Sequence, residues 1–206
     1  MPTVLATLGP NEAIYGEHGI MLFKDPAVGV SRKTIQGGGM LQTLERTTVG
    51  GIPYFLTEFT GPGHVGLSRD GTGEVRILDL AANQTIDVAE GSLLCADAHI
   101  RYGMEYVKGT HRPGRMAGVW LDRLTGPGKV AVHGYGNIIS MTLAPRELIH
   151  VDIGGMLWKD SGVVAKTVNL PFGGGFLGKL EGFEVLELIG PGQVAIQSID
   201  PKSSHF

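Results

Sequence analysis

The chain has 206 residues, with 17 basic residues, 20 acidic residues and a single cysteine, Cys95. Neither charge sign forms a block, which argues against a DNA-binding protein, and one cysteine excludes an internal disulfide framework. No apolar run approaches the roughly 18 residues of a membrane span and no secretory signal is visible, so we expect a cytoplasmic protein without a membrane span.

Short runs of alternating apolar and polar residues follow one another along the chain. Each ends at Gly, Pro, Asn or Asp, and no segment shows the sustained apolar spacing of an amphipathic helix. Such runs predict an all-β protein of sandwich or barrel type. In chain order the clearest runs are Thr3–Leu8, Tyr54–Thr60, Glu74–Leu80, Lys129–His133, Ile138–Leu143 and Gln193–Ile199.

The chain opens on a unit of sequence that occurs twice more. It reads LGPNEAIYGEHGIMLFKD at 8–25, LAANQTIDVAEGSLLCAD at 80–97 and LAPRELIHVDIGGMLWKD at 143–160. Three copies at matched positions indicate an internal triple repeat, in which each copy supplies part of a shared core.

A second unit, built on Gly-Pro-Gly, also occurs three times. The copies are FTGPGHVGLSR at 59–69, LTGPGKVAVHG at 124–134 and LIGPGQVAIQS at 188–198. Pro followed by Gly suits a type II turn, which splays a tight hairpin, so each motif is predicted to be a corner where the chain changes sheet. The corner residues are Gly61, Pro62, Gly63, Gly126, Pro127, Gly128, Gly190, Pro191 and Gly192.

The run after each corner has an apolar face, headed by Val65, Val130 and Val194, and a mixed face. A small residue at the centre of the mixed face indicates close packing, and another strand is favoured over a ligand slot. We retain His64, Lys129, Gln193 and His133 as candidate surface residues for binding. The mixed face carries His64, Lys129 and Gln193, then Gly66, Ala131 and Ala195, then Ser68, His133 and Gln197.

The order of the units is that of a circularly permuted repeat, because the chain begins on the 8–25 unit and ends on a Gly-Pro-Gly unit. We expect one compact domain of three modules, at about 35–100, 101–165 and 166–206, the last completed by residues 1–30. The simplest closure folds Thr3–Asp25 against Phe183–Ile199. In the alternative, the amino-terminal unit completes a neighbouring chain.

Cys95 is the first residue to consider as a catalytic group. Leu93, Cys95, Asp97 and His99 alternate, so a strand would place a thiol and an imidazole on one face. Cys95, however, matches Phe23 and Trp158 in the other copies, which indicates a large apolar core position. We therefore expect a buried, unreactive thiol and no catalytic residue.

The matched aspartates and the remaining histidines are the other residues of metal-ligand type. Asp25, Asp97 and Asp160 match one another and could ring a cation, but an Asp that closes a strand commonly bonds the backbone after it. His150 matches Tyr15 and Asp87, which we interpret as a variable, solvated position. We expect no metal and no cofactor.

The repeated units, with the terminal FGGGFLGKLEGFEVLELIGPGQVAIQSID, resemble the mitochondrial biogenesis family, which is named for altered inheritance of mitochondria. The resemblance extends over most of the chain. It implies a fold similar to that of the tryptophan RNA-binding attenuation protein, a short double-stranded β-helix or β-sandwich. It also implies three such modules around a pseudo-threefold axis, and it brings no established catalytic residues.

Two classes of function remain. The first, which we favour, is a non-enzymatic β-scaffold, a homo-oligomer that self-assembles and acts through an unknown protein partner or a small ligand. The second is an RNA- or ligand-binding module by analogy with the attenuation protein. RNA binding would need Lys or Arg at the same position of every copy, but these positions hold His64, Lys129 and Gln193. A cupin-like metal enzyme ranks last because His64, His111 and His133 lack the ligand spacing.

Overall fold

The computed structural model describes residues 1–33, 55–109, 118–171 and 182–201. These residues form antiparallel strands and one three-residue 3₁₀ turn, η1 (Ile153–Gly155), and within them there is no α-helix. The prediction of an all-β protein is therefore confirmed. None of the described segments is a helix that could cross a membrane.

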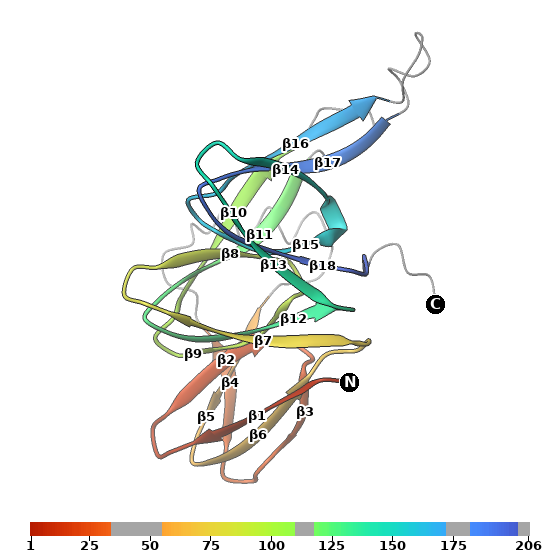
Figure 1. The fold of residues 1–206 in the computed structure, drawn as a ribbon. Coiled ribbons are helices and arrows are strands. Elements are labelled where there is room, and N and C mark those ends of the chain that lie inside the picture. The colour runs from red at the N-terminus through yellow and green to blue at the C-terminus, as the bar shows by residue number, and fades with distance from the viewer. Residues whose placement is uncertain (34–54, 110–117, 172–181, 202–206) are drawn as a thin grey trace.

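Strand pairing forms four antiparallel sheets, of three, six, six and three strands. We divide the strands by chain order into three successive sets of six, called units 1 to 3, which Figure 1 shows following one another from the amino-terminal end (red and orange) to the carboxyl-terminal end (blue). Unit 1 holds β1 (Thr3–Leu8), β2 (Ala13–Glu17), β3 (Met21–Lys24), β4 (Gly29–Lys33), β5 (Leu56–Thr60) and β6 (Gly63–Ser68). Unit 2 holds β7 (Gly73–Leu80), β8 (Thr85–Ala89), β9 (Leu93–Asp97), β10 (Arg101–Lys108), β11 (Gly118–Thr125) and β12 (Gly128–Tyr135). Unit 3 holds β13 (Ile138–Leu143), β14 (Leu148–Asp152), β15 (Met156–Asp160), β16 (Val164–Pro171), β17 (Gly182–Ile189) and β18 (Gly192–Gln197).

Neighbouring units are joined by strand pairing. Within a unit, the sixth strand lies between the first and third, and the fifth lies between the second and fourth. Between units, β2 pairs with β9 and β8 pairs with β15, which builds the six-stranded sheets β4-β5-β2-β9-β12-β7 and β10-β11-β8-β15-β18-β13. The end sheets, β1-β6-β3 and β14-β17-β16, have three strands each, so β3 and β14 lie at sheet edges.

The predicted pairing of the two chain ends is wrong. Thr3–Leu8 pairs with Gly63–Ser68, and the last strand, Gly192–Gln197, pairs with β13 and β15. Of the expected boundaries, those near residues 101 and 166 fall within β10 of unit 2 and β16 of unit 3, and the one near residue 35 lies outside the described residues. Each opening unit of sequence folds with the Gly-Pro-Gly unit that follows it, because strands near in sequence pair at lower entropic cost than the two ends of the chain.

Each Gly-Pro-Gly motif is a corner between sheets, as predicted. The strands before the corners (β5, β11, β17) and those after them (β6, β12, β18) lie in different sheets. The peptide bond before Pro62, Pro127 and Pro191 is cis in all three corners. The second glycine has φ of 135° at Gly63, 137° at Gly128 and 145° at Gly192, where a side chain would be strained.

The three matched aspartates hold these corners in place. Oδ2 of Asp25 accepts a hydrogen bond from the backbone amide of His64 at 2.8 Å. Asp97 and Asp160 do the same for Lys129 and Gln193, both at 2.7 Å. Their role is therefore structural, as favoured from the sequence, but the amide they bind belongs to a distant corner and not to the backbone that follows them.

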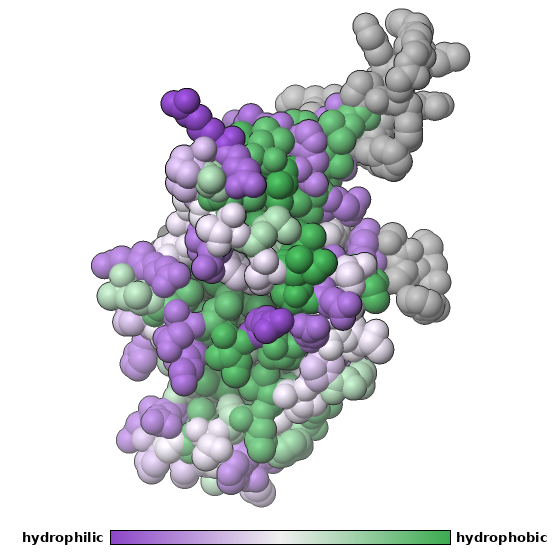
Figure 2. All heavy atoms as spheres, in the orientation of Figure 1, coloured by the Kyte–Doolittle hydropathy of each residue, from purple (hydrophilic) through white to green (hydrophobic). Residues whose placement is uncertain are grey.

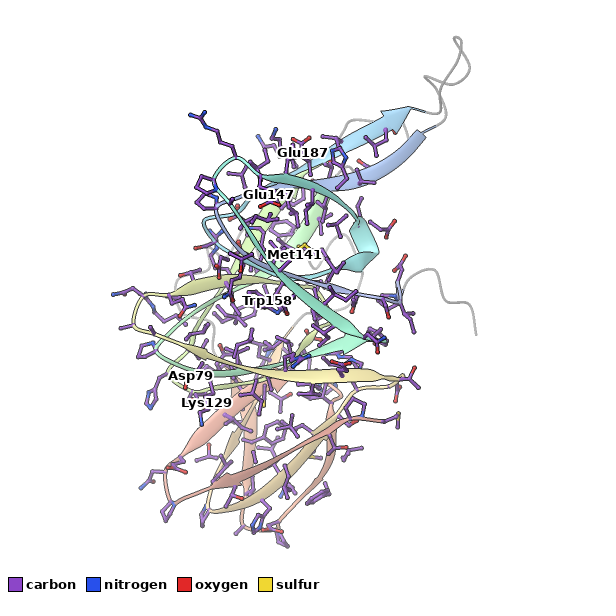
Figure 3. The ribbon with its side chains drawn as sticks, in the orientation of Figure 1. Asp79, Lys129, Met141, Glu147, Trp158 and Glu187 are labelled. Atoms are coloured by element: carbon purple, nitrogen blue, oxygen red, sulfur yellow. The ribbon has the colours of Figure 1, made fainter. Side chains whose placement is uncertain are left out.

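The small residues on the mixed face make room for the third strand of each unit. Gly66 lies opposite Phe23, Ala131 opposite Cys95, and Ala195 opposite Trp158. A Cβ added at Gly66 would lie 2.3 Å from the Phe23 ring. Figure 3 shows Trp158 between the sheets in the interior. The close packing expected here is thus with a strand of the same chain.

The hydrophobic core crosses the joins between units. Tyr15 and Leu56 of unit 1 and Leu157 and Trp158 of unit 3 belong to one buried cluster with the apolar residues of unit 2. A second cluster adds Leu94, Cys95 and Ala131 of unit 2 to the core of unit 1. Each six-stranded sheet therefore contributes to the hydrophobic core of two neighbouring units.

Candidate functional site

A cavity of about 410 Å³ opens between units 2 and 3. The ends of β8, β10, β11, β12 and β18 surround it, together with η1. Its lining combines aromatic rings with a few polar groups, and the residues used below are Tyr106, Trp120, Tyr135, Arg69 and Gln197.

The aromatic wall is formed by a pair of rings on neighbouring strands. Tyr106 of β10 and Trp120 of β11 lie opposite each other, with ring centroids 4.8 Å apart and planes tilted by 43°. A Cβ at Gly118 would lie 2.3 Å from the Tyr106 hydroxyl, so this position must be glycine for the ring to lie as it does. The two rings present an apolar surface for a planar group.

The polar wall is fixed by hydrogen bonds. Arg69 donates through Nη2 to the Glu17 carboxylate and, at 3.3 Å, to the backbone carbonyl of Leu93. Gln197 donates to the carbonyl of Gly154 at 2.7 Å and accepts from the amide of Tyr135 at 2.9 Å. These two hydrogen bonds of Arg69 therefore fix the orientation of its guanidinium beside the cavity.

His133 lies beneath this wall and not at the surface, so its choice as a surface candidate was wrong. The side chain is fully buried, and neither ring nitrogen has a hydrogen-bond partner among the described residues. Its ring meets the Tyr135 ring edge-on, with centroids 4.8 Å apart. Burial, and then the nearby Arg69 charge, lowers the pKa of His133.

The other three candidates are exposed, as expected, but they do not form one site. His64, Lys129 and Gln193 each follow the corner of a different unit. His64 is further held by Nδ1, 2.8 Å from Oδ2 of Asp25, and this hydrogen bond lowers the pKa of Asp25. Lys129 is the one basic residue of the three that carries a permanent charge.

A second group of charges lies buried where β8 meets β15. Nζ of Lys159 lies 2.7 Å from Oδ2 of Asp87, and Nε of Arg123 lies 2.7 Å from Oδ1. Burial alone would raise the pKa of Asp87, but the hydrogen bonds and charges of Arg123 and Lys159 outweigh it and hold the pKa below its ordinary value. The carboxylate is saturated with donors, so the group holds the join together and offers no free base.

Cys95 is buried, as predicted from its match with Phe23 and Trp158. Burial, and then the charge of Asp97, raises the pKa of its thiol to about 12. A thiol with that pKa is protonated at neutral pH and is a poor nucleophile. The structure describes no hydrogen bond from it to His99.

Asp25, Asp97 and Asp160 lie in three different units, and no group of three or more His, Cys, Asp or Glu residues suited to a metal ion occurs within the described ranges. The aromatic pair of the cavity was missed from the sequence. Trp120 corresponds to Phe55 and Glu184 in the other copies, so the aromatic residue is not shared by all three copies.

The sequence profile of the family described as Mitochondrial biogenesis AIM24 matches residues 1–199. The chain belongs to the AIM24 family. No curated protein matches it. Among solved structures, this AIM24 family chain is similar to protein SPYM3_0169 from Streptococcus pyogenes, at 20% sequence identity and a TM-score of 0.73. The similarity covers 98% of this chain and 90% of that one, and at this identity it shows a shared fold and no more.

Proposed function

We propose that this AIM24 family protein is a non-enzymatic β-scaffold that self-assembles and binds a small planar ligand in the cavity beside Tyr106 and Trp120. The cavity is the observation that carries the ligand-binding part. Its volume of about 410 Å³ lies within the range of roughly 300 to 1,000 Å³ that is typical of small-molecule sites.

The lining favours an aromatic ligand with a hydrogen-bond acceptor. The Tyr106–Trp120 pair offers a ring face, and offset stacking on such a face contributes about 0.5–1.5 kcal/mol beyond the area buried. Arg69 also lines the cavity, where its side chain is 18% exposed and its Nη2 is held by Glu17. An acceptor on the ligand would meet the exposed part of this guanidinium.

A non-enzymatic role is supported by the state of the polar groups. The Asp87 carboxylate is neutralised by Lys159 and Arg123, and the Cys95 thiol is held protonated by burial. Neither of these groups is poised as a base or a nucleophile at neutral pH. Three tandem modules like that of the attenuation protein remain part of the proposal. An RNA-binding role has less support, because Lys129 is the only Lys or Arg among the three exposed residues that follow the corners.

Titration calorimetry with indole and with 1-naphthoate tests the cavity. We expect both to bind, with 1-naphthoate tighter because Arg69 meets its carboxylate. Trp120→Ala should weaken both by about tenfold or more, whereas Ile77→Ala, an exposed apolar change on β7 outside the cavity, should leave binding unchanged. Absence of heat with either compound at millimolar concentration, or equal binding by the Trp120→Ala protein, would overturn the ligand-binding role.

A further inference from the structure

Strand β3 exposes side chains whose counterparts are buried in the other two units. Met21, Leu22 and Phe23 are 45%, 55% and 49% exposed. Their counterparts are Leu93, Leu94 and Cys95 on β9 and Met156, Leu157 and Trp158 on β15, all of them buried. Figure 2 shows apolar side chains (green) at the surface of unit 1, the lower unit. β3 thus has the apolar sequence of β9 and β15, but no strand of another unit pairs with it among the described residues.

Strand β14 is the matching edge at the other end of the molecule. Its counterparts β2 and β8 each join a neighbouring unit, but among the described strands β14 pairs only with β17. Leu148 is 44% exposed. His150 is also exposed, although its counterparts Tyr15 and Asp87 are completely buried at the two joins. The interpretation of this position as solvated was wrong for both of them.

The two joins inside the chain use one register. At the first, Ile14 lies opposite Asp97 and Tyr15 opposite Ala96. At the second, Ile86 lies opposite Asp160 and Asp87 opposite Lys159, which are the corresponding positions. Transferred to the free edges, this register sets Ile149 opposite Asp25 and His150 opposite Lys24.

We propose that β14 of one chain pairs with β3 of a second copy of the same chain, in the register of the two internal joins. This inference deepens the proposed function, because it rests on self-assembly and names the surfaces that carry it. The partner of each edge follows from the chain itself. The two counterparts of β3, β9 and β15, already pair with β2 and β8, which are the counterparts of β14.

The charged positions of the second internal join have polar counterparts on the two edges. At the second internal join Lys159 meets Asp87, which also holds Arg123. At the proposed join Lys24 takes the place of Lys159, and His150 and Glu187 take the places of Asp87 and Arg123. Glu187 is a carboxylate held by Lys166 at 2.8 Å and His150 at 3.3 Å, and Figure 3 shows it on the upper unit. Lys24 would therefore lie opposite His150 and near the Glu187 carboxylate, which Lys166 already holds.

One backbone bond of the internal joins is missing at the proposed join. Ala98 donates to the carbonyl of Ala13, and Ser161 donates to that of Thr85, both at 3.0 Å. Their counterpart is Pro26, which has no N–H to donate to Leu148. The join between chains is accordingly weaker by one bond than those inside the chain, which suits a reversible assembly.

The two edges differ, so the association is head-to-tail. Such an interface forms a ring if the rotation closes and a filament if it does not. A ring would hold a fixed number of chains, whereas a filament would grow by whole chains of 21.8 kDa.

Light scattering coupled to size exclusion tests the proposal with one blocked edge at a time. Leu22→Lys blocks β3 and Leu148→Lys blocks β14. Ile77→Lys is the matched control, because Ile77 is 64% exposed on β7, a sheet-edge strand outside the proposed join. We expect wild type and Ile77→Lys to assemble and each blocked variant to be a monomer with an unchanged melting temperature.

Mixing the two blocked variants gives the deciding measurement. Leu22→Lys keeps a free β14 and Leu148→Lys keeps a free β3, so the mixture should form a one-to-one dimer. A monomeric wild type at high micromolar concentration would overturn both this join and self-assembly, while leaving ligand binding to its own titration. A wild-type oligomer unaffected by both variants, or a Leu148→Lys protein that still dimerises alone, would overturn this join and leave self-assembly standing.

Discussion

Matched residues in the three units have acquired different partners, and the buried end of the mixed face shows this best. The Ser68 hydroxyl donates to the carbonyl of Pro2 at 2.9 Å, and Gln197 bonds both Gly154 and Tyr135. His133, at the same position in unit 2, is buried with no partner for either ring nitrogen among the described residues. A buried imidazole without an acceptor is stable only while it is neutral.

The stability of the protein should therefore fall below neutral pH through His133. Burial and Arg69 lower its pKa in the folded state below the ordinary value of 6.5. As the pH drops below about 6.5, His133 binds a proton in the unfolded chain but not in the folded chain. The free energy of unfolding then falls by up to about 1.4 kcal/mol per pH unit. Denaturant unfolding from pH 7.5 to 5 measures the slope. His133→Gln, which copies unit 3, should flatten it, and an unchanged slope in that variant would assign the effect to other groups.

Comparison of the copies predicted apolar positions well and buried polar positions badly. The slot shared by Phe23, Cys95 and Trp158 was found because all three residues suit a core. Tyr15 and Asp87 were misjudged because polar residues that vary look solvated in a sequence. Both are buried with partners that the sequence does not reveal, the Ile100 carbonyl at 3.0 Å from the Tyr15 hydroxyl and Lys159 at 2.7 Å from Asp87.

At the scale of the element, the Gly-Pro-Gly corner has a second requirement besides its positive φ. The first glycine of each corner passes close to a backbone carbonyl. A Cβ would lie 2.4 Å from the carbonyl oxygen of Gly9 at Gly61, of Ala81 at Gly126 and of Ala144 at Gly190. The amides of the same three glycines donate at 2.9 Å to Glu12, Gln84 and Glu147. Each corner is thus packed against the turn that follows the first strand of its unit.

Substitution of one first glycine should destabilise the protein by about 1–3 kcal/mol, the usual cost of overpacking. We choose Gly126→Ala in the central unit. Gly162→Ala is the control, because a Cβ there meets only the Pro191 oxygen at 3.7 Å, and its effect should stay within about 0.5 kcal/mol. Urea unfolding of the two variants gives both numbers, and equal stabilities would show that the corner tolerates a side chain.

The repeat gave the strands and corners of the fold but not the way they are grouped. Three copies of each unit establish a period, and a period fits equally well whichever point is taken as the start of a module. Strand pairing fixes that choice, since β1 pairs with β6 and not with β18. The long strands β10 and β16 were not singled out because their residues do not repeat between units, and the cavity beside β10 was missed with them.

At the scale of the whole molecule, unit 1 depends on the amino-terminal segment, and unit 2 depends on unit 1. β6 pairs only with β1 and β3 among the described strands, and β5 only with β2 and β4. The core of unit 1 takes Leu8, Ile14 and Ile20 from this segment and covers Leu94 and Cys95 of unit 2. Loss of the segment would therefore remove partners from one unit and shielding from the next.

Deletion of residues 1–25 should abolish cooperative folding and expose Cys95. The loss of Leu8, Ile14, Tyr15 and Ile20, all buried, costs about 2–5 kcal/mol for each large side chain, a total as large as the roughly 5–15 kcal/mol that stabilise a domain. In the full-length protein, burial raises the pKa of the Cys95 thiol to about 12, so a thiol reagent should label it far more slowly than the unfolded chain. In the deletion variant it should react at the unfolded rate. Full-length Cys95→Val should melt normally and take no label, which ties the signal to this residue. A deletion variant that melts near the full-length temperature with its thiol protected would mean that units 2 and 3 fold without unit 1.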